Sequence, residues 1–222
     1  MKIILRIGGS VLGSPPNPSI VNKYAEVVTK LVSRGHTIGV VVGGGEISRQ
    51  YIVSAKRLGL SSYHQDLIAI HVSRVNAGLV SMKLGGVSSV PTTVDSMVSR
   101  LNTTRVAVMG GLRPGITTDT VAALVAEVWK PNIFIKASNQ AGIHTADPKT
   151  HKNAKLLPSV SYPKLTEILG GRHKPGIHRI IDPVAVEHLA RHKFNMVVLD
   201  GRNPMNILKA VDGKRVGTRV SE

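Results

Sequence analysis

Residues 37–45 read TIGVVVGGG, so that six residues of a buried-type strand run directly into three glycines. The apolar run is typical of a parallel strand covered on both faces. Glycine at the end of a strand lets backbone N–H groups approach a ligand with no Cβ in the way. Because ligands of open parallel sheets bind at the carboxyl ends of the strands, this stretch predicts both a fold class and a binding edge.

The same pattern occurs twice more along the chain. Residues 2–7 (KIILRI) end in Gly8-Gly9-Ser10, and residues 105–109 (RVAVM) end in Gly110-Gly111. A helix start beside such a turn adds partial positive charge, and three turns in one chain favour a polyphosphate site over glycines that serve shape alone. The signatures GxxxxGK[ST] and GxGxxG are absent, so neither a Walker-type NTPase nor a Rossmann dehydrogenase is indicated.

The remaining segments alternate between strand and helix patterns, which predicts an α/β fold with a largely parallel sheet. Residues 138–162 are predicted to form a loop that contains a hairpin, and they are the best candidate for a boundary between two lobes. Strands are expected at 132–136 and 195–199, an edge-like segment at 87–91, and helices at 19–33 (with Ser19 as N-cap), 46–58, 62–84, 94–100, 119–129, 163–169, 182–192 and 204–211.

Composition narrows the class of partner. The 222 residues carry a net charge of +16, which favours anionic partners such as nucleotides, polyphosphates, nucleic acid or anionic membranes. The basic residues are scattered, so a solvated basic surface explains most of them. The absence of cysteine excludes disulfides. No stretch approaches the roughly 18–20 apolar residues that cross a membrane, and a soluble intracellular protein is expected.

Several polar residues near the glycine turns are candidate site residues. Arg49 could reach a phosphate or could be a surface arginine. Asp66, near the start of a helix, could bind a ribose or could compensate the charge of the helix N-terminus. Thr117 or Thr118 is the expected N-cap of the helix that starts near Asp119, and capping is compatible with a phosphate site at the same helix end.

Two histidines stand four residues apart on the predicted helix at 182–192. His188 and His192 could suit zinc at this spacing. Because no third ligand is evident nearby, a solvated helix face is the favoured interpretation.

Six motifs in order connect the chain to a known family. They are IGGSVL (7–12), VVVGGGEISRQYI (40–52), DLIAIHVSRVNA (66–77), VMGGLRPGITTD (108–119), TADPK (145–149) and IDPVA (181–185). Over nearly the whole chain they resemble archaeal-type UMP kinases of the amino-acid-kinase family. The resemblance implies a three-layer αβα sandwich formed by a single domain, 1–222, with an N-terminal acceptor-binding lobe of about 1–130 and a C-terminal ATP-binding lobe of about 131–222.

The resemblance also implies a reaction. Such enzymes transfer the γ-phosphoryl group of ATP to UMP, with Mg²⁺, giving UDP and ADP in pyrimidine nucleotide biosynthesis. The resemblance further implies a cytoplasmic protein that assembles as a homo-hexamer, a trimer of dimers.

Residue roles carry over by position. By resemblance, the catalytic set is Asp119, which orients catalytic lysines, with Lys174 and Arg6. The implied ATP-binding residues are Gly9, Ser10, Gly45, Arg49, Ser138, Asn139, His144 and Asp147. The implied UMP-binding residues are Gly44, Asp66, Arg113, Pro114, Gly115, Ile116, Thr117 and Thr118. No metal ligand from the protein is assigned.

The chain departs from the family pattern at a few positions. Arg6 stands where many members have lysine. SNQAGIH (138–144) stands where the family reads TNVDGVY, so that Ala141 replaces an aspartate and His144 a tyrosine. Arg113 adds a charge to the acceptor loop.

Other functions remain open on the sequence alone. Another small-molecule kinase of the same fold could act on isopentenyl phosphate, carbamate or N-acetylglutamate. The charge of +16 and the basic loop at 172–179 motivate a nucleic-acid-binding protein, although 3% aromatic residues leave few stacking platforms for single strands. A scaffold oligomer with a degenerate site is a third alternative.

Overall fold

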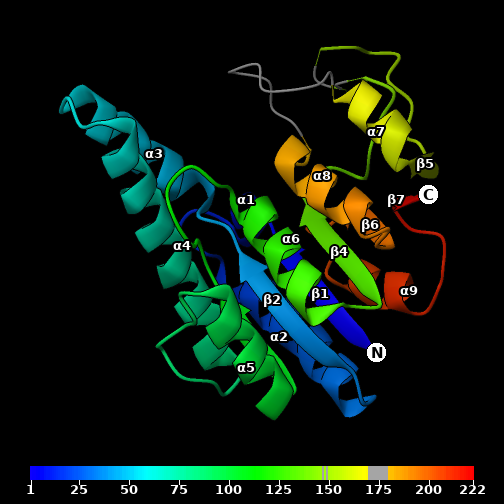
Figure 1. Ribbon diagram of the computed structural model, residues 1–222, viewed down its shortest axis with the longest axis horizontal. Helices are drawn as coiled ribbons and strands as arrows, with labels where there is room; N and C mark the ends of the chain where they lie inside the picture. The colour runs from blue at the N-terminus through cyan, green and yellow to red at the C-terminus, as the bar shows by residue number, and fades with distance from the viewer. Residues whose placement is uncertain (147, 149, 170–179) are drawn as a thin grey trace.

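The fold is built on one twisted sheet (Figure 1). The computed structural model describes residues 1–146, 148, 150–169 and 180–222. Within these ranges seven strands lie in the order β3-β2-β1-β4-β6-β7-β5, and every pair is parallel except the antiparallel pair β6–β7. The strands are β1 (Lys2–Ile7), β2 (Thr37–Val42), β3 (Val106–Met109), β4 (Ile133–Ser138), β5 (Ser159–Ser161), β6 (Met196–Asp200) and β7 (Thr218–Ser221). The predicted α/β class with a mostly parallel sheet is confirmed.

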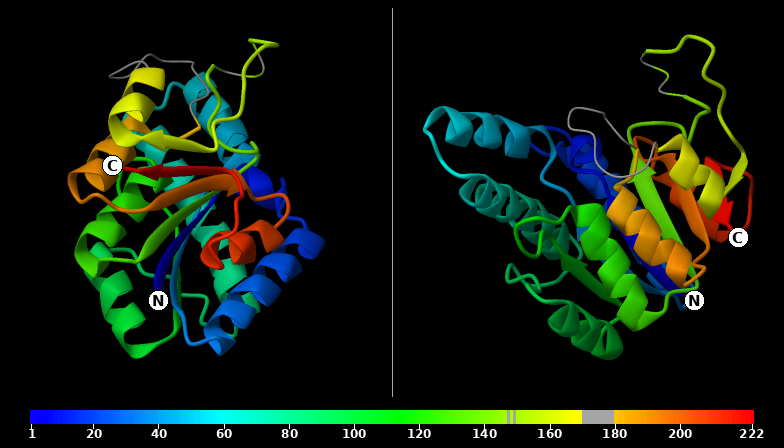
Figure 2. Two further views of the ribbon diagram at one scale, coloured as in Figure 1. Left: turned by 90° about the vertical axis from the view of Figure 1, so that its right-hand side faces the viewer. Right: turned by 45° about the horizontal axis from the view of Figure 1, so that its top comes forward.

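Helices cover both faces of the sheet, and the result is three layers (Figure 2). The apolar runs of the central strands alternate between two cores: Ile4 and Phe134 pack into one, and Leu5 and Ile135 into the other. One face carries α5 (Val94–Thr103), α6 (Thr118–Trp129), α7 (Tyr162–Ile168) and α8 (Pro183–Arg191); the other carries α1 (Gly9–Leu12), α2 (Pro18–Ser33), α4 (Ser62–Lys83) and α9 (Met205–Val211), and α3 (Gly45–Arg57) packs on α4. None of the helices in the described ranges is long and apolar enough to cross a bilayer.

Side chains cap the N-termini of α2, α4, α5, α6, α7 and α8. The prediction of Ser19 as the N-cap of α2 is wrong, because Asn17 caps the helix with its Oδ1, which accepts from Ser19 N at 2.9 Å. Pro18 then takes the first helical position, where its fixed φ suits the helix and its missing N–H costs nothing. For α6, the structure selects Thr117, whose Oγ1 accepts from Thr120 N at 3.3 Å.

The short edge elements differ from the predictions. Strands β5 and β7 were not predicted, since three or four residues are too few to show a periodic pattern. The segment 87–91 is not a strand: Ser81 Oγ donates to Val87 O and Arg100 Nη1 donates to Ser89 O, so side chains take the carbonyls that a neighbouring strand would need. In the expected hairpin region, a single antiparallel bridge joins His144 and Leu156 in the part that is described.

The histidine pair of α8 is not simply a solvated face. His188 Nδ1 and His192 Nε2 each lie 2.9 Å from Oε1 of Glu127 on α6. Burial would raise the pKa of the Glu127 carboxyl, but its contacts with the two histidines outweigh this, and the pKa lies below its ordinary value. The i, i+4 spacing therefore joins α8 to α6 through one carboxylate.

Candidate active site

A cavity of about 900 Å³ opens at the carboxyl ends of the central strands. It lies where the sequence places the glycine turns after β1 and β2, which is the edge that parallel sheets use for ligands. Ten of the residues predicted from the sequence line it: Arg6, Gly9, Ser10, Gly44, Gly45, Arg49, Thr117, Asp119, Ser138 and Asn139. The topology thus gathers these ten residues from four separate segments of the chain, 6–10, 44–49, 117–119 and 138–139.

The first two glycine turns pack backbone against backbone. A Cβ at Gly9 would overlap the backbone of Gly45 and Gly43, lying 2.6 Å from Gly45 Cα. Gly45 itself has a φ of +72°, a conformation that disfavours any residue with a side chain. The glycines are required for this close approach, and it leaves the N-terminal ends of α1 and α3 side by side at the cavity.

One face of α4 holds the glycine turns in place. Asn76 Nδ2 donates to Gly43 O at 3.0 Å and to Gly44 O at 3.2 Å. Ser73 Oγ accepts from Gly111 N at 2.7 Å, and Arg74 Nε donates to Gly111 O at 3.0 Å. These residues belong to the motif at 66–77, and their polar side chains satisfy backbone groups that the turns leave unpaired.

Three charged side chains meet at the floor of the cavity. Asp119 Oδ1 lies 2.6 Å from Arg6 Nε and 2.5 Å from Lys136 Nζ. Arg6 Nη2 also donates to Thr118 Oγ1 at 2.7 Å. The cluster carries two positive charges and one negative charge, so that its balance favours an anionic ligand.

A second layer of polar groups fixes Asp119. The backbone N–H of Asp182 donates to Asp119 Oδ2 at 3.2 Å. The Asp182 side chain caps α8 and also accepts from Thr117 Oγ1 and Thr120 Oγ1, each at 2.7 Å. The start of α6 and the start of α8 are therefore joined directly behind the charged cluster.

The cluster shifts the pKa values of its members. Burial would raise the pKa of the Asp119 carboxyl, but the charges of Arg6 and Lys136 outweigh burial and hold the pKa below its ordinary value. Burial and the charge of Arg6 lower the pKa of the Lys136 ammonium to about 8, although Asp119 opposes the shift. Asp119 is therefore ionised at neutral pH, and the Lys136 ammonium begins to lose its proton as the pH rises toward about 8.

A smaller cavity of about 210 Å³ adjoins the first and shares Gly44, Ser48 and Thr117 with it. Its wall carries Asp66 on α4 and the loop that leads into α6, including Arg113, Ile116 and Thr118. Asp66 Oδ2 accepts from Gly115 N at 2.8 Å, so that the carboxylate anchors this loop. Gly115 has a φ of +84°, which explains the glycine in PGITTD.

Several predicted residues lie elsewhere. Pro114, Gly115 and His144 line neither cavity, and the His144 ring lies 3.2 Å from Gly142 O. Arg49 lines the larger cavity, but its side chain is about half exposed and pairs with Glu46 at 2.6 Å. Asp147 and Lys174, together with the basic loop, lie outside the described residues.

Sequence reasoning missed Lys136 and gave no role to Ser73, Arg74 or Asn76. Lys136 had a visible signal, since it is the one charged residue in the apolar strand IFIKAS. A charge in a buried strand needs a partner, and that partner comes from a helix 17 residues earlier in the chain. The polar residues of α4 had no local signal, because a helix pattern does not show which loop its polar face meets.

Comparison with known proteins agrees with this geometry. The sequence profile of the amino acid kinase family matches residues 1–200, and the chain belongs to this family. It is 38% identical over 224 residues to a uridylate kinase of Natronomonas pharaonis (99% of this chain, 98% of the relative), and 33% identical over 221 residues to one of Hyperthermus butylicus (99% and 97%).

Solved structures give the same relationship. The crystal structure of uridylate kinase from Archaeoglobus fulgidus is 37% identical, covers the whole of both chains and has a TM-score of 0.90. UMP kinase from Bacillus anthracis, at 19% identity and a TM-score of 0.83 over 99% of this chain and 95% of that one, shares the fold.

Proposed function

We propose that this chain is a UMP kinase, which transfers the γ-phosphoryl group of ATP to UMP and gives UDP and ADP in the pyrimidine nucleotide biosynthesis of the cytoplasm. The observation that carries the proposal is a pair of adjoining cavities that share Gly44 and Thr117 beside a buried cluster of charged residues. A phosphoryl donor bound in one cavity and a phosphoryl acceptor bound in the other would meet where the two cavities share these residues. The full-length relatives that carry the name uridylate kinase support the same reaction.

ATP occupies the larger cavity in this proposal. Backbone N–H groups of the paired glycine turns, with Ser10 and Gly45, hold its phosphates. Arg49 is placed to exchange its exposed contact with Glu46 for a phosphate oxygen, because a half-exposed ion pair costs little to break. Ser138 and Asn139 lie at the carboxyl end of β4, toward the base and ribose; the roles of His144, Asp147 and Lys174 stay predictions.

UMP occupies the smaller cavity. Asp66 binds the ribose while it anchors the loop 113–118, and Gly44 and Thr117, which belong to both cavities, hold the phosphate toward the donor. This geometry favours an acceptor whose phosphate points at the glycine turns and whose sugar points at α4. Arg113 adds a positive charge at the outer wall of the cavity.

Phosphoryl transfer requires that the two substrates are positioned in line and that the negative charge of their phosphates is compensated. An oxygen of the UMP phosphate attacks the γ-phosphorus in line, the bond from that phosphorus to the β-bridging oxygen breaks, and the electron pair leaves with ADP. The attacking oxygen is already anionic, so no strong general base is required. Arg6 supplies positive charge next to the turns, and Asp119 holds Arg6 in that position.

The cavity fits Mg²⁺ as a companion of the nucleotide. The carboxylates among the described lining residues are Glu46 and Asp119, and both are paired with basic side chains. Mg²⁺ commonly keeps several waters and binds substrate phosphates rather than a protein cage, and Ser10 and Asn139 offer neutral oxygens at this edge. When bound, the ion neutralises charge on the donor phosphates.

We further propose the homo-hexamer, a trimer of dimers, as the working assembly. Support comes from exposed apolar side chains of α4, the helix that forms with α3 the hairpin projecting from the body of the molecule in Figure 1. Val75, Leu79 and Met82 follow one face of α4 and are 72%, 41% and 52% exposed. A contiguous apolar stripe of this kind is typical of a subunit contact.

The test is a coupled assay of ADP formation with Mg-ATP and each of UMP, CMP, AMP, GMP and isopentenyl phosphate. We expect preference for UMP by about tenfold or more, the discrimination that about 1.4 kcal/mol provides. Asp66→Ala should raise the KM for UMP and leave the KM for ATP unchanged. Asp95→Ala, which removes an exposed carboxylate from the first turn of α5, is the matched control. Turnover with another acceptor, or with none, would refute the UMP-kinase proposal.

A further inference from the structure

Ser48 is a buried polar residue on a helix that is mostly exposed. The buried residues of α3 are Ser48 and Ala55, and Ser48 is 7% exposed. It lies in the first turn of α3 and lines both cavities. A hydroxyl that is removed from bulk water needs a hydrogen-bond partner, because burial without one destabilises the protein.

The hydroxyl of Ser48 has no hydrogen-bond partner among the residues that the structure describes. A serine within a helix commonly donates to the carbonyl four residues earlier, which here is Gly44 O. Asn76 Nδ2 on α4 donates to that carbonyl instead, at 3.2 Å. The donor of Ser48 is therefore available to a ligand in the cavities that the residue lines.

The two cavities share Gly44, Ser48 and Thr117, which together form the junction between them. Gly44 has no side chain. Thr117 Oγ1 donates to Asp182 at 2.7 Å and accepts from Thr120 N at 3.3 Å, so its hydroxyl is already engaged. Among the described residues of the junction, Ser48 thus supplies the side-chain donor that has no protein partner.

Packing places Ser48 on the acceptor side of the junction. Gly45 meets the backbone of Gly9, and both line the larger cavity but not the smaller one. Gly44, in contrast, lies against Ser48: a Cβ on Gly44 would be 2.5 Å from Ser48 Cβ and 3.5 Å from the carbonyl oxygen of Ala69. Ala69 lines the smaller cavity and belongs to α4, which runs beside α3 (Figure 1).

From this geometry we infer that Ser48 is a substrate-binding residue whose hydroxyl donates a hydrogen bond to an oxygen of the acceptor phosphate. The inference rests on the proposed function and adds a side chain that holds this phosphate at the junction. The N-terminus of α3, which begins at the same place, favours the same negative charge. The hydroxyl binds an oxygen that does not attack and keeps its proton, so it positions the phosphate for the in-line reaction.

The experiment compares the binding of UMP with that of uridine, which lacks the phosphate, by calorimetry on the full-length protein. In Ser48→Ala, the Kd for UMP should rise by about tenfold or more and the Kd for uridine should stay within about twofold, because the lost hydrogen bond goes to a charged group. Ser48→Cys keeps the size of the side chain but is a weak donor, so it should lose most of the same preference for UMP. Ser54→Ala, at an exposed position of the same helix, is the matched control and should match the wild type.

Stability and kinetics separate this role from a structural one. Because alanine favours a helix and no protein hydrogen bond within the described residues is lost, Ser48→Ala should keep or raise the Tm. Its kcat/KM for UMP should fall by about tenfold or more, with the KM for ATP within about twofold.

The outcomes that contradict the inference differ from those that contradict the proposed function. A wild type that turns over no UMP would refute the proposed function itself. A wild type that prefers UMP to uridine, with a Ser48→Ala variant that keeps the same preference, would overturn the role of Ser48 alone. A lower Tm in Ser48→Ala with unchanged UMP binding would assign Ser48 to the fold and would overturn the inference as well.

Discussion

At the residue scale, the site depends on one carboxylate, that of Asp119, which pairs with two basic side chains. Asp119 Oδ1 meets both Arg6 and Lys136, and its Oδ2 accepts the Asp182 backbone N–H. Removing one partner of a buried ion pair costs more than the pair contributes, because a buried charge is left uncompensated. Asp119 therefore positions the cations in the native fold as well as in the proposed reaction.

Asp119→Asn should lower the free energy of unfolding by about 3–5 kcal/mol and reduce kcat by at least about 10²-fold, because Arg6 and Lys136 then face each other without an anion. Loss of the carboxylate should lower the pKa of Lys136 further below about 8. The native variant then binds fewer protons than the native wild type, so the stability deficit should shrink as the pH rises toward 8. Urea unfolding across this range measures it, with Asp95→Asn as control. A deficit that does not change with pH would contradict the shared-carboxylate account.

At the scale of elements, α4 sets the spacing of the two cavities. Asn76 is 6% exposed and reaches the turn after β2, while Ser73 and Arg74 reach the turn after β3. Asp66 on the same helix anchors the loop before α6. One helix thereby holds two loops, the one after β2 and the one between β3 and α6, and a change on its inner face should affect loops distant in sequence.

Asn76→Ala should destabilise the protein by about 1–3 kcal/mol, because the carbonyls of Gly43 and Gly44 lose a buried donor. The KM values for both ATP and UMP should rise, since Gly44 lines both cavities. Thermal and urea unfolding with steady-state kinetics measure this, and Asn22→Ala on the exposed face of α2 is the matched control. A rise in only one of the two KM values would show that the turn does not act as a single unit.

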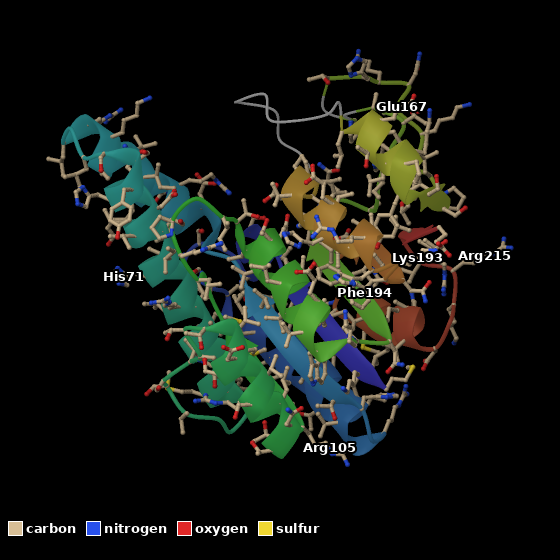
Figure 3. The ribbon with its side chains drawn as sticks, viewed as in Figure 1. His71, Arg105, Glu167, Lys193, Phe194 and Arg215 are labelled. Carbon is tan, nitrogen blue, oxygen red and sulfur yellow. The ribbon has the colours of Figure 1, made fainter. Side chains whose placement is uncertain are left out.

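At the scale of the whole molecule, the charge of +16 is not gathered at the site. In Figure 3, Arg105 and Arg215 lie at well separated points of the periphery. The apolar stripe Val75, Leu79 and Met82 on α4 is the more specific surface feature, and His71, one turn before Val75, marks its outer side.

If that stripe is a subunit contact, Val75→Glu combined with Met82→Glu should produce smaller species, because each charge would be buried without a partner. Size-exclusion chromatography with light scattering measures the mass. Val128→Glu is the control, since Val128 is 55% exposed on α6, on the opposite face of the sheet. An unchanged mass in the double variant would place the contact elsewhere.

The amino-acid sequence by itself determined the central strands, the glycine turns, the family and the residues of the cavity floor except one. These signals are local: an apolar run of six residues and a glycine that follows it are visible without knowledge of the rest of the chain. The glycine turns at 8–10 and 43–45 predict a phosphate site from the sequence, and the structure adds that the backbones of Gly9 and Gly45 lie so close together that a Cβ on either would overlap the other.

Only the tertiary structure decided which segments meet. Lys136 lies beside Arg6 because β1 and β4 pair in register across 130 residues, and no local pattern encodes that pairing. The polar face of α4, the short strands β5 and β7, and the contact of His188 and His192 with Glu127 likewise depend on neighbours distant in sequence. The physical reason is that these contacts stabilise the protein only after the sheet has brought their partners together. The central strands, in contrast, are favoured by the strand propensity of their own residues.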